Sequence, residues 1–84
     1  MSGRITITFD PAEGAVQRMV GLIERRGFRL RGLVMSEEAS EATIRMDVEG
    51  RDPSRRIDIV VRQLERLVDV RTVQCSTAEA GPIA

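Results

Sequence analysis

The stretch of sequence that decides the fold is Asp10-Pro11-Ala12-Glu13-Gly14-Ala15-Val16-Gln17-Arg18-Met19-Val20-Gly21-Leu22-Ile23-Glu24-Arg25-Arg26-Gly27-Phe28. Apolar side chains recur in it at helical spacing, at Val16, Met19, Val20 and Ile23. This spacing predicts a helix over residues 11–26 with one apolar face. Asp10 is its expected N-cap, with Pro11 at the first helical position and Glu13 completing a capping-box pattern. Gly27 stands where a residue in the left-handed conformation commonly ends a helix.

Gly14 is unexpected at its place in this helix. If Asp10 is the N-cap, Gly14 falls in the first turn, where glycine costs roughly 1 kcal/mol relative to alanine. The missing side chain must therefore serve a purpose. Two candidates are close packing of the backbone and a ligand near the N-terminus of the helix.

Alternating apolar and polar side chains predict strands on both sides of this helix. The four predicted strands cover residues 4–9, 28–35, 42–49 and 68–75, and the polar residues 36–41 form a hairpin loop between the second and third. A second helix is predicted over residues 53–67, where Asp52-Pro53 repeats the start of the first helix.

The order of these elements predicts an α+β fold of the ferredoxin-like βαββαβ type. Two right-handed crossovers would place the strands in the order 4-1-3-2 in an antiparallel sheet, with both helices on one face. Leu33 and Met35 are then apolar exceptions on a polar open face, and we expect them to form an interface. The domain is expected to span residues 1–76, followed by a flexible tail over residues 77–84.

The composition argues against several classes of function. The 84 residues carry 13 basic and 13 acidic side chains, a balance that disfavours binding to nucleic acid or to a membrane surface. The expected open face has no aromatic side chain on which RNA bases could stack. No apolar run approaches the roughly 18 residues of a membrane span, so we expect a cytoplasmic protein.

Catalytic and metal-binding side chains are scarce. The chain has one cysteine, Cys75, and no His or Tyr. A single cysteine allows neither an internal disulfide nor a multi-cysteine metal site. Glu37, Glu38 and Glu41 crowd the predicted hairpin loop without a basic or metal-binding companion. We therefore predict no catalytic residue and no metal site, which leaves a binding module as the favoured class.

Residues 9–28 resemble the first half of an ACT domain, and more narrowly the small regulatory subunit of acetolactate synthase (acetohydroxyacid synthase). The matching positions are Gly14, Arg18, Gly21, Leu22, Arg26, Gly27 and Phe28, without a gap. Further on, the segment from Leu64 to Val70 resembles the passage from helix to strand in that family. The resemblance covers residues 4–76, is most specific over residues 9–35, and fits the short single-domain form.

The resemblance implies a non-catalytic subunit in branched-chain amino-acid biosynthesis. Its partner would be the large subunit of acetolactate synthase, which holds thiamine diphosphate, magnesium and FAD, and no cofactor would bind to this chain. ACT domains typically pair side by side as dimers and bind an amino acid between protomers, near the loop after the first strand. The implied effector residues are Pro11, Ala12, Glu13, Gly14, Ala15, Arg29 and Leu30.

Two departures from the family pattern weaken the expectation of effector binding. The asparagines that hold the amino acid in the family are matched here by Pro11 and Arg29. Pro11 has neither an amide side chain nor a backbone N–H, and Arg29 is long and charged. We therefore expect an activating subunit that is weakly sensitive or insensitive to valine. The alternative is an ACT-type sensor that binds a branched-chain effector at its dimer interface and serves another metabolic enzyme.

Overall fold

The computed structural model describes residues 2–52 and 54–77, which form four strands and two helices in the predicted order. The elements are β1 (Ser2–Phe9), α1 (Ala15–Arg25), β2 (Phe28–Glu38), β3 (Glu41–Gly50), α2 (Ile57–Leu64) and β4 (Val70–Thr77). The backbone of β4 continues through Thr77, the first residue of the predicted tail. The rest of that tail, residues 78–84, lies outside the described residues.

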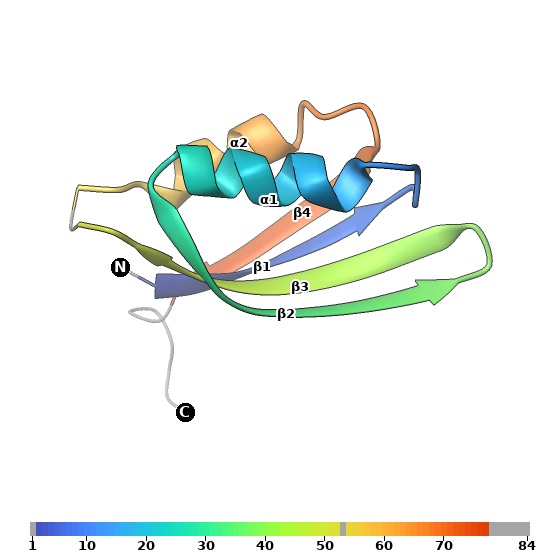
Figure 1. The fold of residues 1–84 in the computed structure, drawn as a ribbon, viewed down its shortest axis with the longest axis horizontal. Helices are drawn as coiled ribbons and strands as arrows, with labels where there is room; N and C mark the ends of the chain where they lie inside the picture. Colours follow the sequence, from blue (N-terminus) through green and yellow to red (C-terminus); the bar gives the residue numbers. More distant parts are fainter. Residues whose placement is uncertain (1, 53, 78–84) are drawn as a thin grey trace.

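The strands form one antiparallel sheet in the order β2-β3-β1-β4. Both helices lie on the same face of this sheet (Figure 1). This arrangement confirms the predicted ferredoxin-like fold and the predicted strand order. It places β1 and β3 in the centre and leaves β2 and β4 as the two edge strands.

The core lies between the two helices and the covered face of the sheet. At its centre Ile5 and Ile7 stand opposite Met46 and Ile44, and all four are fully buried. The other buried hydrophobic side chains are Phe9, Ala15, Met19, Leu22, Ile23, Phe28, Ala42, Val48, Ile57, Val60 and Leu64. Burying one large apolar side chain contributes about 1.5–3 kcal/mol, so this layer is the main source of stability. Among the described residues no polar or charged side chain is buried.

The start of α1 differs from the prediction, and the predicted capping box is wrong. The N-cap is Gly14, at a φ of 81°, and no side chain caps the helix. The Asp10 carboxylate instead accepts a hydrogen bond from Arg71 of β4, a partner that the local sequence does not reveal. Gly14 therefore lies outside the helix interior, and its missing side chain permits a left-handed backbone conformation.

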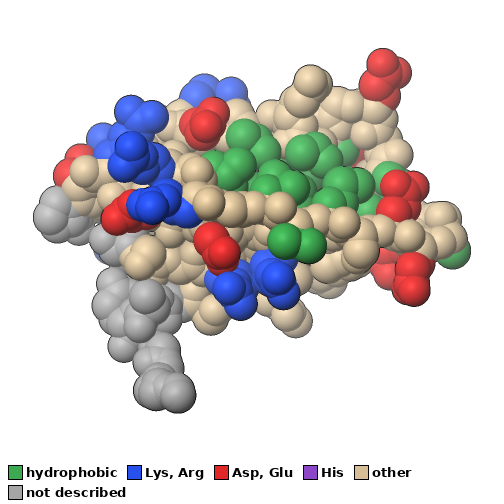
Figure 2. All heavy atoms as spheres, turned by 60° about the horizontal axis from the view of Figure 1, so that its bottom comes forward, with side chains coloured by type: hydrophobic (Ala, Val, Ile, Leu, Met, Phe, Trp, Pro, Cys, Tyr) green, Lys and Arg blue, Asp and Glu red, His purple; other side chains and the backbone are tan. Residues whose placement is uncertain are grey.

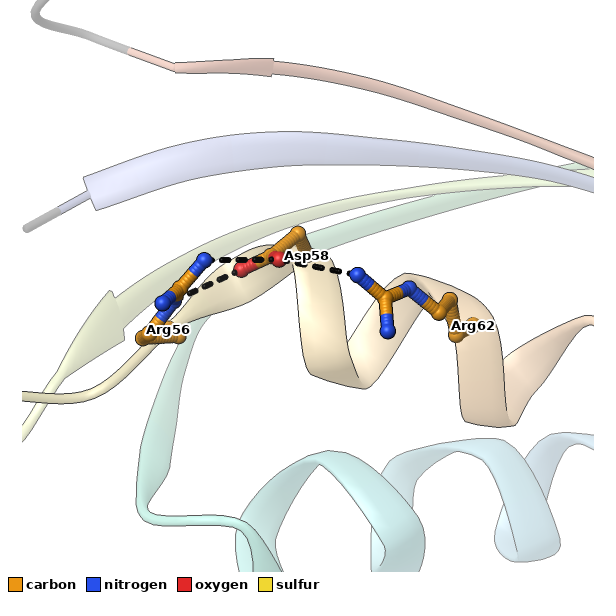
Figure 3. Close-up of polar contacts among 3 residues, drawn as sticks. All are labelled: Arg56, Asp58 and Arg62. Atoms are coloured by element: carbon orange, nitrogen blue, oxygen red, sulfur yellow. Dashed lines mark hydrogen bonds and ion pairs between the residues drawn. The ribbon is translucent and has the colours of Figure 1, made fainter.

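The second helix is also shorter than the predicted range 53–67. The Asp52 carboxylate does not cap it, because it accepts hydrogen bonds from the N–H and the hydroxyl of Ser54 in a local turn. Asp58 lies in the first turn of α2 and pairs with Arg56 and Arg62 (Figure 3). Hydrogen bonds from Arg56 hold the pKa of Asp58 below its usual value, which favours a negative charge at the positive end of the helix dipole.

A tight turn joins β2 to β3, and the predicted hairpin loop over residues 36–41 is wrong. Strand pairing continues until Glu38 stands opposite Glu41. Only Ala39 and Ser40 lie in the turn, and Ala39 adopts a left-handed φ of 53°. Two-residue turns with positive φ match the right-handed twist of paired strands, which explains how so short a connection suffices.

Gly27 ends α1 in the left-handed conformation that the sequence predicts, at a φ of 88°. Its N–H donates to the carbonyl oxygen of Glu24 at 3.1 Å, and its own carbonyl oxygen accepts from the N–H of Arg51 at 2.8 Å. The Arg55 side chain crosses over this glycine, so that a Cβ placed there would lie 2.4 Å from Nε of Arg55. Glycine is thus favoured at position 27 both by the positive φ and by the Arg55 side chain that lies over it.

We expect Gly27→Ala to lower the free energy of unfolding by about 1–2 kcal/mol, because a side chain at positive φ is strained. Gly21→Ala is the matched control inside α1, where the added Cβ meets only the tip of the flexible Arg25 side chain, at 3.2 Å. Alanine is favoured over glycine in a helix by about 1 kcal/mol, so this variant should be at least as stable as the parent. Urea denaturation measures both, and an unchanged stability of Gly27→Ala would contradict the interpretation.

Candidate functional site

The loop between β1 and α1 contains most of the predicted effector residues. Within it the Ala12 N–H donates to the carbonyl oxygen of Asp10 at 2.7 Å, and the Ala15 N–H donates to the carbonyl oxygen of Ala12 at 3.0 Å. The side chains of residues 11–13 are exposed. The structure therefore gathers the predicted residues 11–15 at one end of α1, and the positive end of that helix lies at Ala15 instead of Pro11.

A network of charged side chains holds this loop against the rest of the domain. Arg71 donates hydrogen bonds to Asp10 in the loop and to Glu41 at the start of β3, the latter at 3.1 Å. Arg18 of α1 donates to Asp69, in the turn that precedes β4. The Asp10 N–H also donates to the carbonyl oxygen of Asp69, at 2.8 Å. Asp10 of the loop is thus held both by β4 and by the turn that precedes β4.

Sequence reasoning missed this network because its members are distant in the chain. The three side-chain contacts join residues that are 30 to 61 positions apart. Arg71 lies where the register between β1 and β4 shifts: Thr8 pairs with Thr72, but the next residue, Phe9, pairs with Val70. Neither the shift nor the pairing partner has a signal in the local sequence pattern.

The other two predicted effector residues, Arg29 and Leu30, lie at the opposite end of the sheet. Arg29 pairs with Glu49 near the end of β3, whereas Phe9, next to the loop, pairs with Ala42 near its start. At roughly 3.3 Å per residue these two places are about 23 Å apart along β3. One protomer therefore does not bring the two parts of the predicted effector site together. A shallow hollow of about 400 Å³ beside Arg29 is lined by Arg29, Glu49, Gly50 and Arg51.

A bulge in β2 changes which of its side chains share a face. Leu30 pairs with Val48, and the next pair along the two strands joins Gly32 to Asp47. Arg31 is therefore an extra residue in β2. Because side chains alternate between the two faces of a strand, one extra residue moves every later side chain to the other face.

For this reason the predicted placement of Leu33 and Met35 on the open face is wrong. Leu33 stands opposite Met46 and Met35 opposite Ile44, two core residues on the face that the helices cover. Leu33 and Met35 nevertheless remain 42% and 40% exposed, because β2 is an edge strand. Val34 takes the open face and is 57% exposed. Three consecutive exposed apolar side chains thus follow one edge of the sheet, and their role as an interface stays a prediction.

Figure 2 shows one side of the molecule, with its side chains coloured by type. Hydrophobic side chains gather there in one patch. Lys and Arg side chains are most numerous toward the left of the patch, and a group of Asp and Glu side chains lies toward its right. An apolar patch bordered by charged side chains is typical of a surface that contacts protein.

Cys75 and the metal-binding types of side chain were the remaining candidates for chemistry in the sequence. Cys75 is exposed on β4, and desolvation raises the pKa of its thiol, which favours the unreactive protonated form. Within residues 2–52 and 54–77, no three His, Cys, Asp or Glu side chains are grouped so as to hold a metal ion. In that same part of the chain no helix has the length and apolar character needed to span a bilayer.

Comparison with known proteins identifies the family. Residues 11–73 match the family described as ACT domain. The chain is 33% identical over 70 residues to a probable acetolactate synthase small subunit of Methanothermobacter thermautotrophicus, covering 83% of this chain and 42% of that protein. It is 27% identical over 66 residues to the acetolactate synthase small subunit of Haemophilus influenzae, covering 79% of this chain and 40% of that protein. The chain thus spans about two fifths of the length of these curated relatives.

The fold agrees with that assignment. An ACT domain protein from Streptococcus pneumoniae superimposes with a TM-score of 0.79, covering 95% of this chain and 92% of that one at 16% identity. The strand order and the two helices on one face of the sheet define a small domain of the ferredoxin-like class. Since the family match covers most of the chain, the chain belongs to the ACT domain family, and the predicted resemblance to acetolactate synthase small subunits is confirmed.

We expect Arg71→Ala to loosen the β1–α1 loop without unfolding the domain. Arg71 is about half exposed, so losing its two ion pairs should lower the free energy of unfolding by about 1 kcal/mol or less. The Asp10 amide should nevertheless exchange its hydrogen several-fold faster, since the side chain that holds the loop is gone. Arg4→Ala, which removes a pair with Asp47 on the open face, is the control. Equal exchange at Asp10 in both variants would show that Arg71 does not hold the loop.

Proposed function

We propose that this chain is a non-catalytic regulatory subunit of acetolactate synthase, and that it raises the activity of the large catalytic subunit in the cytoplasm. The observation that carries the proposal is the similarity to acetolactate synthase small subunits over about four fifths of the chain. Membership of the ACT domain family agrees with it. Thiamine diphosphate, magnesium and FAD would all be bound by the large subunit.

We further propose that valine has little effect on this subunit. Two amides that hold the amino acid in related sites are replaced here, by Pro11 and by Arg29. A lost buried hydrogen bond weakens binding by about 1–3 kcal/mol, so two losses reduce affinity by roughly two orders of magnitude or more. The β1–α1 loop is also tied down by the ion pair between Arg71 and Asp10.

Titration of a purified large subunit with this chain tests both statements. We expect acetolactate formation to rise to a plateau as the chain is added, and to stay within about twofold when millimolar valine is present. No activation would contradict the assignment as a subunit and favour an ACT-type amino-acid sensor for another enzyme. Strong inhibition by valine would keep the assignment but contradict the insensitivity. In that event Pro11 and Arg29 would not be the residues that decide binding.

The double variant Pro11→Asn/Arg29→Asn examines the residues that decide valine sensitivity. Restoring both amides should create or strengthen valine binding, measured by calorimetry on the isolated chain. Arg45→Asn removes an exposed arginine in the middle of β3, opposite Thr6 and Val34, and serves as the control. If the double variant binds valine no better than this control, the effector site lies elsewhere.

We also propose that the chain forms a homodimer by antiparallel pairing of β2 with β2 of a second copy. The edge is self-complementary in charge, because Arg29 and Arg31 lie near its start and Glu37 and Glu38 at its end. Between them lies the exposed apolar run of residues 33–35. An edge strand with an apolar centre gains from pairing, because its unpaired backbone groups and apolar side chains are covered together.

Because of the bulge at Arg31, there is one register of the two β2 strands in which paired side chains lie on the same face of the sheet along the whole strand. If Val34 pairs with its symmetry mate, Leu33 stands opposite Met35 of the partner subunit on the helix side. The bulge then brings Arg29 opposite Glu38 of the partner subunit, and both side chains are on the open face. Side chains on the helix side therefore pair with side chains on the helix side, and side chains on the open face pair with side chains on the open face. Without the extra residue, the apolar and the charged pairs would not fit one register.

Charge reversal on this edge tests the dimer. Arg29→Glu and Glu38→Arg should each raise the dissociation constant of the dimer about tenfold or more, since two symmetry-related attractions become repulsions. The double variant Arg29→Glu/Glu38→Arg restores opposite charges and should recover the affinity, as measured by sedimentation equilibrium. Arg66→Glu, away from β2, is the control for net charge. Failure of the double variant to recover would exclude this register.

A further inference from the structure

Positive charge is concentrated at the end of the sheet where β2 begins and β3 ends. Residues 24–31, 49–52 and 54–58 together contain seven arginines and four acidic residues. These parts of the chain meet, because the N–H of Arg51 donates to the carbonyl oxygen of Gly27 at 2.8 Å. Figure 2 shows basic side chains gathered toward the left, the side on which β2 begins and β3 ends in Figure 1. A chain of zero formal net charge thus has one markedly basic end.

The hollow beside Arg29 lies in this basic region. It has a volume of about 400 Å³ and is lined by Arg29, Glu49, Gly50 and Arg51. The Glu49 carboxylate already has a partner, since it accepts a hydrogen bond from Arg31 at 2.5 Å. In the described part of the chain, by contrast, no acidic side chain forms an ion pair with Arg29 or Arg51. Among these residues, two guanidinium groups at the hollow therefore keep their N–H donors available for a ligand.

The lining of the hollow favours a hydrophilic anion. None of the four lining residues has an apolar side chain, so a branched apolar group would gain nothing from burial there. Two guanidinium groups carry two positive charges, whereas a carboxylate carries one negative charge. A phosphate monoester carries a charge of about −1.5 to −2 at pH 7 and has three strong acceptor oxygens. It therefore matches two arginines in charge, and guanidinium groups bind phosphate oxygens in bidentate geometry.

We infer that this hollow binds the phosphate group of a small phosphorylated molecule, with Arg29 and Arg51 donating to its oxygens. The volume lies within the range of small-molecule sites. Such a site goes beyond the proposed function, because it requires neither the large subunit nor a branched-chain effector. It is compatible with the proposed dimer, because the five N–H donors of Arg29 can serve a phosphate and Glu38 of the partner subunit together.

NMR titration of the isotope-labelled chain at constant ionic strength tests this site. The probes are inorganic phosphate, glycerol phosphate and acetate. We expect the amide signals of Gly50 and Arg51 to shift and to saturate at millimolar phosphate, and glycerol phosphate to bind at least as tightly. Acetate should bind about fivefold more weakly, because it carries a single charge.

Three results of this titration would contradict the inference. Shifts that never saturate, or that are spread over the whole molecule, would mean that the hollow is not a site. Equal affinity for acetate would exclude phosphate as the preferred group. Weaker binding of glycerol phosphate than of inorganic phosphate would exclude a phosphorylated molecule as the ligand.

Arg51→Gln removes one of the two guanidinium groups and lies outside β2, so it leaves the edge of the proposed dimer unchanged. We expect the variant to bind phosphate about three- to fivefold more weakly, which is the effect of losing one exposed charged contact. Arg45→Gln is the matched control, because it removes the same charge from an exposed position in the middle of β3. Equal phosphate affinities of the two variants would show that net charge attracts the anion, and would overturn the inference.

Removing the acid from the hollow should have the opposite effect. Glu49→Gln takes away the negative charge of the lining and releases Arg31, so phosphate should bind about threefold more tightly. Asp47→Asn is the matched control, since it also removes an exposed carboxylate paired with an arginine, but one that does not line the hollow. An equal gain in affinity for Asp47→Asn would again assign the effect to net charge and overturn the inference.

Discussion

Burial of one face of the sheet under two short helices is the constraint on which the rest of the structure depends. The buried residues are all apolar, and they come from β1, β2, β3, α1 and α2. A domain of this size buries only about 60–65% of its unfolded surface, so little apolar area remains to stabilise loops and edges. Ion pairs between exposed side chains and, as we propose, contacts with other chains supply what the core does not.

The β1–α1 loop illustrates how the remaining parts are held. It contains no buried side chain before Ala15, and its position depends on hydrogen bonds to the turn before β4 and on the Arg71 network. Each exposed ion pair is weak by itself. Together they hold the loop in a conformation that the helix alone would not impose.

The two edge strands of the sheet, β2 and β4, differ in the charges of their side chains. β2 carries opposite charges at its two ends around an apolar centre, which suits pairing with an inverted copy of itself. β4 between residues 72 and 76 carries no charged side chain.

The sequence by itself determined the order of elements, the ferredoxin-like fold and the family, because apolar periodicity and the Gly14–Phe28 motif are local properties. Gly27 at the end of α1 was predictable for the same reason. The helix starts were not, because Asp10 and Asp52 bond to Arg71 and Ser54 instead of capping. The face on which Leu33 and Met35 lie was not predictable either, because it depends on the bulge at Arg31. That bulge is set by the pairing of β2 with β3. Contacts between residues far apart in the chain decided the start of α1 and the face of Leu33 and Met35, whereas a local turn at Asp52 and Ser54 competed with capping of α2.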